Sequence, residues 1–198
     1  DFTLNDSEPL KELLHDGERY DGTDYILIGE DIFLDDESSL ALKNFVEGGG
    51  DAFIATLTPP SRILYQVYHQ ECDFPIDYAQ YKGNSVTLNF YHESLKTKSG
   101  VSYAYRRYED TKALYMWDYI SEHAFCDTTK RVVALGFQAD NRVNFIRISL
   151  GAGNLYLHSN PIVFTNYFMT DSEKVTYAAS VFSHLDGRRI IWDEFSKI

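Results

Sequence analysis

The first part of the chain alternates between short apolar runs and one helical stripe. Residues 25–29 (YILIG) form a continuous apolar run, typical of a strand buried on both faces. Asp35 and Asp36 then favour a helix start, and Gly48 favours its end. Residues 51–56 form the next apolar run. A strand, a helix and a strand within about 30 residues predict a βαβ unit with parallel strands.

The pattern changes after a second predicted helix. That helix is expected to follow Pro59 and Pro60 and to bury Ile63, Leu64 and Val67. Residues 73–127 show no long helical period, whereas the apolar runs at 86–90 and 114–119 are typical of strands. We therefore expect a β-rich insertion at about 73–127.

The last third of the chain predicts a hairpin, a helix and a final strand. Residues 131–138 and 143–148 read as strands joined by a tight turn at Asp140 and Asn141, and residues 154–158 read as another strand. Thr170 and Glu173 have the spacing of a capping box. The helix that they open is expected to bury Val175, Ala178, Ala179, Phe182 and Leu185. Residues 189–192 predict the last strand.

These elements predict one α/β domain over residues 1–198. Alternation of strands and helices favours a mainly parallel sheet between two helix layers, with the β-rich insertion attached to it. Ligands of such open sheets bind beyond the carboxyl ends of the strands.

Composition excludes some partners. The net charge is −12, with 30 acidic residues against 18 basic ones, whereas nucleic-acid phosphates are bound by clustered Lys and Arg. No stretch approaches the roughly 20 apolar residues of a membrane-spanning helix. We therefore predict no nucleic-acid partner and no membrane-spanning segment within this sequence.

Metal and redox sites are not indicated. Cys72 and Cys126 are far apart and form no C-x-x-C pair, which argues against a redox motif or a thiolate zinc site. The six histidines are scattered without zinc-type spacing. We therefore predict no metal and no cofactor, and the two cysteines are either bonded or free.

Four segments together resemble a bacterial domain-of-unknown-function family numbered 4350. They are residues 45–55 (FVEGGGDAFIA), 151–161 (GAGNLYLHSNP), 164–167 (FTNY) and 190–194 (IIWDE). The resemblance implies an extracytoplasmic, periplasmic domain of a membrane-anchored protein that is N-terminally incomplete in this chain. It also implies a flavodoxin-like fold, similar to the class I glutamine-amidotransferase-like group, and supplies no activity.

Polar residues follow several predicted strands and define a candidate ligand edge. This edge consists of Glu30, Asp31, Thr56, His158, Asn160, Asp193 and Glu194. If the strands are parallel, these residues meet at one side of the sheet. Amidotransferase-type chemistry needs a nucleophile on a sharp strand-to-helix turn, but Thr56 is followed by Leu-Thr-Pro-Pro without a Cys or a Ser elbow.

Three functional hypotheses follow. The leading one is a non-catalytic binding or scaffolding domain whose partner is an envelope protein or a small ligand. The alternative is a hydrolase that uses His158 with Asp193 or Glu194; against it, hydrogen bonds that fix a turn are the preferred explanation of His158 in the absence of a nucleophile. A second alternative is carbohydrate or peptide binding through the aromatic insertion, by Tyr103, Tyr105, Tyr108, Tyr115, Trp117 and Tyr119.

Overall fold

The computed structural model describes residues 1–14, 19–68, 77–106, 113–126 and 131–198. The helices of the described residues are α1 (Leu10–Leu13), α2 (Asp36–Glu47), α3 (Ser61–Tyr68) and α4 (Ser172–Phe182), with short 3-10 helices at Glu122–Phe125, Ala139–Asn141 and Pro161–Phe164. The main strands are β1 (Phe2–Asn5), β2 (Thr23–Ile28), β3 (Asp51–Ala55), β6 (Ser85–Phe90), β7 (Val101–Ala104), β10 (Val132–Gln138), β11 (Val143–Leu150), β12 (Gly153–His158) and β13 (Arg189–Asp193).

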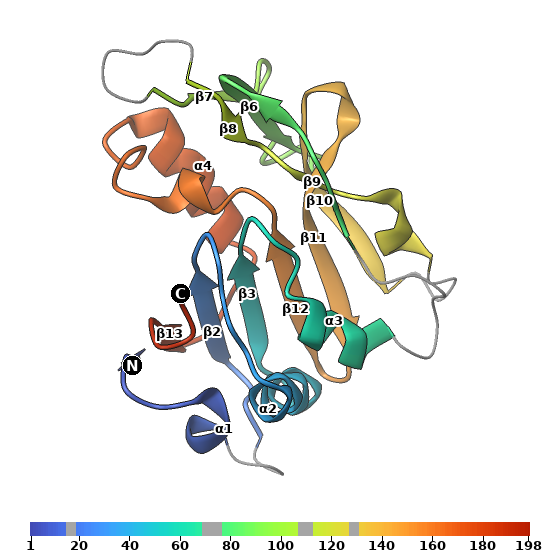
Figure 1. The fold of residues 1–198 in the computed structure, drawn as a ribbon, viewed down its shortest axis with the longest axis vertical. Helices are drawn as coiled ribbons and strands as arrows, with labels where there is room; N and C mark the ends of the chain where they lie inside the picture. The colour runs from blue at the N-terminus through green and yellow to red at the C-terminus, as the bar shows by residue number, and fades with distance from the viewer. Residues whose placement is uncertain (15–18, 69–76, 107–112, 127–130) are drawn as a thin grey trace.

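These nine strands form one mixed sheet in the order β1-β13-β2-β3-β12-β11-β10-β6-β7 (Figure 1). The first five strands in this order (β1, β13, β2, β3 and β12) are parallel to one another. The predicted β2–α2–β3 unit is confirmed. From β12 to β7 every neighbouring pair is antiparallel. Four of the eight pairings are therefore parallel and four antiparallel.

The expected flavodoxin-like, class I glutamine-amidotransferase-like sandwich with a mainly parallel sheet is wrong. The fold is mostly β, and its described residues contain four α-helices, of which α1 has only four residues. The reason lies in the connections: β11 follows β10 after residues 139–142, and β12 follows β11 after residues 151–152. A parallel crossover needs a dozen or more residues, so these short links force antiparallel pairing and leave no room for an α-helix.

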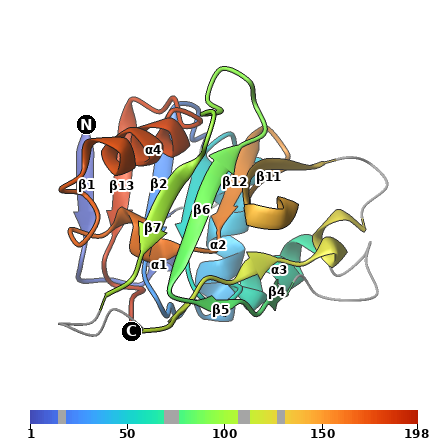
Figure 2. The ribbon, with the colours of Figure 1, turned by 90° about the horizontal axis from the view of Figure 1, so that it is seen from above.

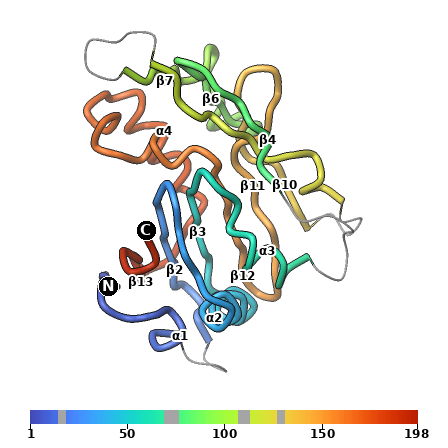
Figure 3. The backbone as a smooth tube through the Cα atoms, in the orientation of Figure 1, coloured from blue at the N-terminus to red at the C-terminus, as the bar shows by residue number. Residues whose placement is uncertain are grey.

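The sheet buries apolar side chains on both faces. One core contains side chains of α1, α2 and α3, together with Tyr25 and Leu27 of β2. The other contains Tyr177 and Val181 of α4, together with side chains of β6 and β7. Figure 2 shows α2 and α4 on opposite sides of the sheet, with β6 and β7 on the same side as α4. The sheet therefore curls over α4, and the tube in Figure 3 shows β6 and β7 at the far end of the molecule from α1 and α2.

The predicted insertion does not form a separate layer. β6 and β7 lie within it and extend the main sheet by pairing β6 with β10. The strand expected at 114–119 is two short ones, β8 (Tyr115–Met116) and β9 (Tyr119–Ile120), which pair with β5 (Lys82–Gly83) and β4 (Tyr78–Ala79). Part of the predicted insertion lies outside the described residues.

Helix capping is confirmed for α2 and shifted for α4. Asp35 caps α2 by accepting the Ser38 N–H at 2.7 Å. The cap of α4 is Asp171 rather than Thr170, because the Asp171 side chain accepts the Glu173 N–H at 2.9 Å. The face that α4 buries consists of Tyr177, Ala178 and Val181.

Candidate functional site

The parallel strands bring three of the predicted edge residues together. β2, β3 and β12 are adjacent, so Glu30, Thr56 and His158 all lie at or just beyond their carboxyl ends. The Thr56 N–H donates to the His158 carbonyl oxygen at 3.1 Å, and the Thr56 Oγ1 donates to the Glu30 carbonyl oxygen at 3.1 Å. Thr56 is fully buried and its hydroxyl is committed to this turn, which leaves it a structural role.

His158 is completely enclosed. Its Nδ1 accepts the Asn160 N–H at 3.1 Å, and its Nε2 lies 3.0 Å from the Tyr177 hydroxyl oxygen. Because Nδ1 is an acceptor, the ring proton sits on Nε2 and is donated to Tyr177. Burial lowers the pKa of His158 to about 3. The ring is therefore neutral at physiological pH and held in one tautomer.

A buried amide network surrounds this histidine. Asn144 of β11 and Asn160 are both fully buried, and Asn144 Nδ2 donates to Asn160 Oδ1 and to the Tyr177 hydroxyl, each at 3.3 Å. Gln138 Nε2 donates to the carbonyl oxygens of Trp117 and Asp118 at 2.9 Å. The network thus connects the ends of β10, β11 and β12 to α4 and to the segment before β9.

Two acceptors of this network lack a partner in the described part of the chain. They are the side-chain oxygens of Gln138 and Asn144. Gly136 makes room for Asn144, since a Cβ there would lie 3.1 Å from the Asn144 Oδ1. The pairing of β10 with β11 is irregular at this same glycine. The network therefore depends on local backbone adjustment of β10.

Asp193 forms a separate buried cluster. One carboxylate oxygen accepts the Tyr25 hydroxyl at 2.6 Å and the Ser196 hydroxyl at 2.7 Å. The other accepts Asn5 Nδ2 and the Ser196 N–H, each at 3.2 Å. Burial, and secondarily the Asp193 charge, raise the pKa of Tyr25 well above its ordinary value. Asp193 thereby ties β1, β2 and the C-terminal segment to β13.

His158 and Asp193 are not brought together. β2 and β3 lie between β13 and β12, which places the two residues roughly 14 Å apart at about 4.8 Å per strand. They also project to opposite faces, because Asp193 contacts Tyr25 in the α2-side core and His158 packs on Phe145 in the α4-side core. A hydrolase built on this pair would need the two groups within hydrogen-bond reach.

The remaining acidic edge residues are exposed. Glu194 accepts a hydrogen bond from Trp192 Nε1 and pairs with Lys197. The side chain of Asp31 is exposed, and its main-chain oxygen accepts the Ile198 N–H at 3.2 Å. Neither residue joins the His158 network.

Glu30 instead meets an aromatic cluster at the surface. The Tyr115 hydroxyl donates to Glu30 Oε1 at 3.1 Å, and burial, followed by the Glu30 charge, raises the pKa of Tyr115. The Tyr115 ring lies 5.0 Å from Tyr105, which lies 6.0 Å from Tyr167. Tyr105 and Tyr115 are half-buried, and Tyr167 is exposed. We name Glu30, Tyr105, Tyr115 and Tyr167 the edge patch.

The other aromatic residues singled out from the sequence divide between core and surface. Tyr103 and Trp117 are fully buried, so neither ring is available for stacking on a ligand. Tyr119 is half-buried, with the Arg142 guanidinium 5.4 Å from its ring centre. Tyr108 lies outside the described residues. The aromatic surface is therefore smaller than the alternation of Tyr predicts, and it includes Tyr167 from a distant segment.

The described residues also bear on the cysteines, on metal binding and on membrane-spanning helices. Cys126 is disulfide-bonded, and Cys72 lies outside the described residues. No group of three His, Cys, Asp or Glu side chains capable of holding a metal occurs among the described residues. None of the described helices has the length and apolar character needed to cross a bilayer.

Sequence reasoning identified His158 and Asn160 but missed Asn144, Gln138 and Tyr177. A signal existed for Asn144, because an amide at a position between Val143 and Phe145 interrupts an apolar strand. A buried amide in a strand requires hydrogen-bond partners, which predicts a polar network. No sequence signal indicates that Tyr177, rather than Val175, faces the sheet.

Comparisons with known proteins leave the family open. No family model matches the chain, and no curated protein matches it. Among solved structures, the chain is similar to the exo-beta-1,4-mannosidase Op5Man5 from Opitutaceae bacterium strain TAV5, at 14% identity and a TM-score of 0.47. The match covers 84% of this chain and 26% of that enzyme, so the chain spans about a quarter of its length. The resemblance to family 4350 stays a prediction.

Proposed function

We propose that this chain is a non-catalytic binding domain of a membrane-anchored, extracytoplasmic bacterial protein. The observation that carries the proposal is the state of His158: enclosed, neutral, and bonded to an amide N–H and a phenol. A general base has to reach a proton of its substrate, directly or through one water. His158 serves the fold instead, and the domain acts by binding an envelope protein or a small ligand.

The edge patch is the surface proposed to contact the partner. Its Glu30 carboxylate is exposed, and the Tyr115 phenol beside it is half-buried. Aromatic rings beside a carboxylate suit ligands that combine apolar faces with hydrogen-bond donors. Carbohydrate or peptide binding at Tyr105, Tyr115 and Tyr167 is therefore the second candidate function, favoured by the exposure of Tyr167.

The proposed compartment is supported by Cys126. Its disulfide is of the kind that persists in oxidising compartments such as the periplasm and is rare in the cytosol. The anchoring segments are proposed from the family resemblance alone.

The test is capture of partners from the native envelope by the intact protein. The bait is compared with a Glu30→Gln/Tyr167→Ala variant and with a matched control, Glu122→Gln/Tyr65→Ala, whose residues are also exposed. We expect the wild type and the control to retain a partner that the edge-patch variant loses.

Purified protein is assayed in parallel against ester, peptide and glycoside substrates. Turnover that survives extensive purification would contradict the non-catalytic proposal. Equal retention of partners by all three baits would exclude the edge patch and move the binding surface elsewhere.

A further inference from the structure

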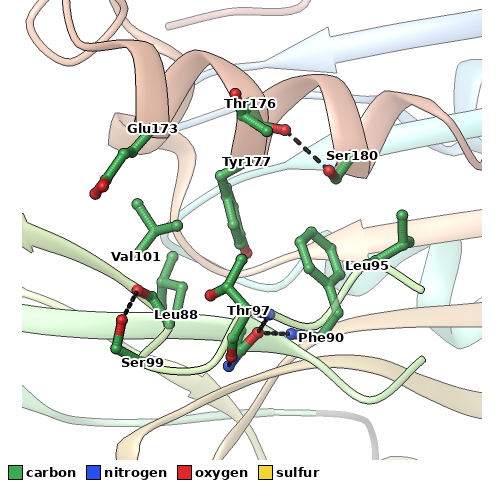
Figure 4. Close-up of a pocket in the computed structure, with 12 residues that line it drawn as sticks. Leu88, Phe90, Leu95, Thr97, Ser99, Val101, Glu173, Thr176, Tyr177 and Ser180 are labelled. Atoms are coloured by element: carbon green, nitrogen blue, oxygen red, sulfur yellow. Dashed lines mark hydrogen bonds between the residues drawn. The ribbon is translucent and has the colours of Figure 1, made fainter. Parts of the chain in front are cut away.

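A cavity of about 200 Å³ opens between α4 and the β6–β7 hairpin (Figure 4). Its apolar walls come from Leu88 and Phe90 of β6, Val101 of β7, and Leu95 of the connecting loop. Tyr177 extends from α4 toward these strands, and its ring stacks on Phe90 at 4.9 Å. The cavity is smaller than the roughly 300–1,000 Å³ of sites for drug-sized ligands, so it suits a small molecule.

The α4 wall of the cavity offers hydrogen-bond acceptors. Thr176 donates its hydroxyl to the Ser172 carbonyl oxygen at 2.8 Å, and Ser180 donates its own to the Thr176 carbonyl oxygen at 2.9 Å. With these protons committed to the helix, the two hydroxyl oxygens can only accept from a ligand. The third polar group on this wall is the Glu173 carboxylate, which is an acceptor by nature.

The hairpin wall adds few donors. The Asn89 amide is occupied by its own loop, donating to the Thr97 carbonyl oxygen at 2.7 Å and accepting the Thr97 N–H at 3.0 Å. The Ser99 hydroxyl donates to the Gly100 carbonyl oxygen at 3.5 Å. The Thr97 hydroxyl also lines the cavity and can donate, so a ligand here meets more acceptors than donors.

Charge at the cavity has one sign. Glu173 is the one ionisable residue on its walls apart from the Tyr177 phenol, and no ion pair of the described residues involves it. Lys96, in the nearby loop, pairs with Glu93 at 3.5 Å, and Lys98 is exposed and does not line the cavity. The net charge of −12 adds a general attraction for cations.

We propose that this cavity binds a small organic cation: a primary amine carried on an apolar alkyl or aryl body. The ammonium lies against Glu173 and Thr176, and the apolar body packs on Phe90 and Tyr177. An ammonium supplies three donors and no acceptor, which matches the acceptors of the α4 wall. This site goes beyond the proposed function and does not depend on it, because no edge-patch residue lines the cavity.

The test uses three probes with the same body and different head groups: 2-phenylethylamine, 2-phenylethanol and 3-phenylpropionate. Each is titrated into the purified domain at millimolar concentrations while amide NMR shifts are followed. We expect saturable shifts at Phe90, Thr97, Gly100 and Tyr177 for the amine, weaker binding of the alcohol, and none of the carboxylate. The His158 Nε2–H signal is expected to move as well, because that proton is bonded to Tyr177.

Two variants and a control locate the head group and the body. Glu173→Gln is expected to raise the Kd of the amine about threefold, as for an exposed ion pair, and Ser180→Leu to abolish binding by filling the cavity. Glu12→Gln removes the same charge on α1 and should leave the Kd unchanged.

No saturable shift with the amine, or equal affinity for the alcohol or the carboxylate, would overturn the proposal. Glu173 is exposed, so its variant gives a readable result even if Ser180→Leu does not fold. Partner capture through the edge patch is unaffected by either outcome.

Discussion

His158 and Tyr177 meet through a 3.0 Å contact between Nε2 and the phenolic oxygen, at the point where the sheet touches α4. Through Tyr177 the histidine becomes part of the link between β12 and the helix that the sheet curls over. The same tyrosine also lines the cavity between α4 and the β6–β7 hairpin. One side chain therefore joins the buried amide network to the proposed ligand site.

Tyr177→Phe tests whether this contact stabilises the fold. The substitution keeps the ring and leaves the His158 Nε2–H without its acceptor in the core. A buried donor without a partner costs about 1–3 kcal/mol, so we expect the free energy of unfolding to fall by that amount. Urea denaturation should show a lower midpoint with an unchanged slope. The control is Tyr91→Phe, at an exposed ring, which should change stability by less than about 0.5 kcal/mol.

Acid should weaken the fold through His158. The unfolded chain takes up a proton at this residue near its ordinary pKa of about 6.5, whereas the folded protein does so only near its pKa of about 3. Between these values the unfolded state binds more protons, so stability falls as the pH is lowered, by up to about 1.4 kcal/mol per pH unit.

The His158 contribution is isolated by difference. In His158→Gln, the free energy of unfolding should depend less steeply on pH between about 6.5 and 3 than in the wild type. Identical pH profiles for wild type and His158→Gln would be incompatible with a buried neutral imidazole.

Asp24 should act in the opposite direction. Burial raises the pKa of Asp24 to about 6, although its bond from the Gly187 N–H opposes the rise. The folded state therefore takes up this proton before the unfolded state does, and stability from this group grows as the pH falls from about 6 to about 3.8.

Asp24→Asn keeps an acceptor for Gly187 while removing the charge. The variant is expected to be more stable than the wild type at pH 8 and to lose that advantage near pH 4. Chemical denaturation at the two pH values measures this difference, with Asp21→Asn as the exposed control. A variant less stable than the wild type at pH 8 would show that the ionised carboxylate is favourable where it lies.

Asp193→Asn tests whether the Asp193 carboxylate has a structural role rather than a catalytic one. The amide cannot accept all four hydrogen bonds that Asp193 now accepts from Asn5, Tyr25 and Ser196. We expect a loss of about 1–3 kcal/mol in unfolding free energy, since bonds to a charged group are among the stronger ones. Glu194→Gln, at the exposed neighbour, should lose less than about 1 kcal/mol. A fully stable Asp193→Asn would remove the structural role assigned to this residue.

Local elements were more predictable than the sheet they build. The runs at 25–29 and 51–56 and the cap at Asp35 carry their own signals, and the structure confirms them. The hairpin at 139–142 was predicted, but the fold class followed the βαβ unit instead, and β6 and β7 join the sheet because β6 pairs with β10, a strand distant in sequence. Such pairings depend on tertiary packing, which the local pattern does not encode.

The sequence predicted some residues of the candidate edge correctly and misplaced others. Strand ends locate Glu30, Thr56 and His158 correctly on one side of the sheet, because β2, β3 and β12 are adjacent and parallel. Asp193 is separated from His158 by the order of the strands and by the face of the sheet to which each side chain projects. Neither property can be predicted from the local sequence. The Glu30–Tyr115 contact joins segments 85 residues apart and leaves no local trace.

The most direct test of a non-catalytic edge is the protonation state of His158, followed by ¹⁵N NMR of the imidazole nitrogens between pH 8 and pH 4. We predict a ring protonated on Nε2 alone, with Nδ1 as the acceptor, and no titration across this range. A His158 that titrates near its ordinary pKa of about 6.5 would mean that the ring reaches solvent as a working base, and would contradict the account.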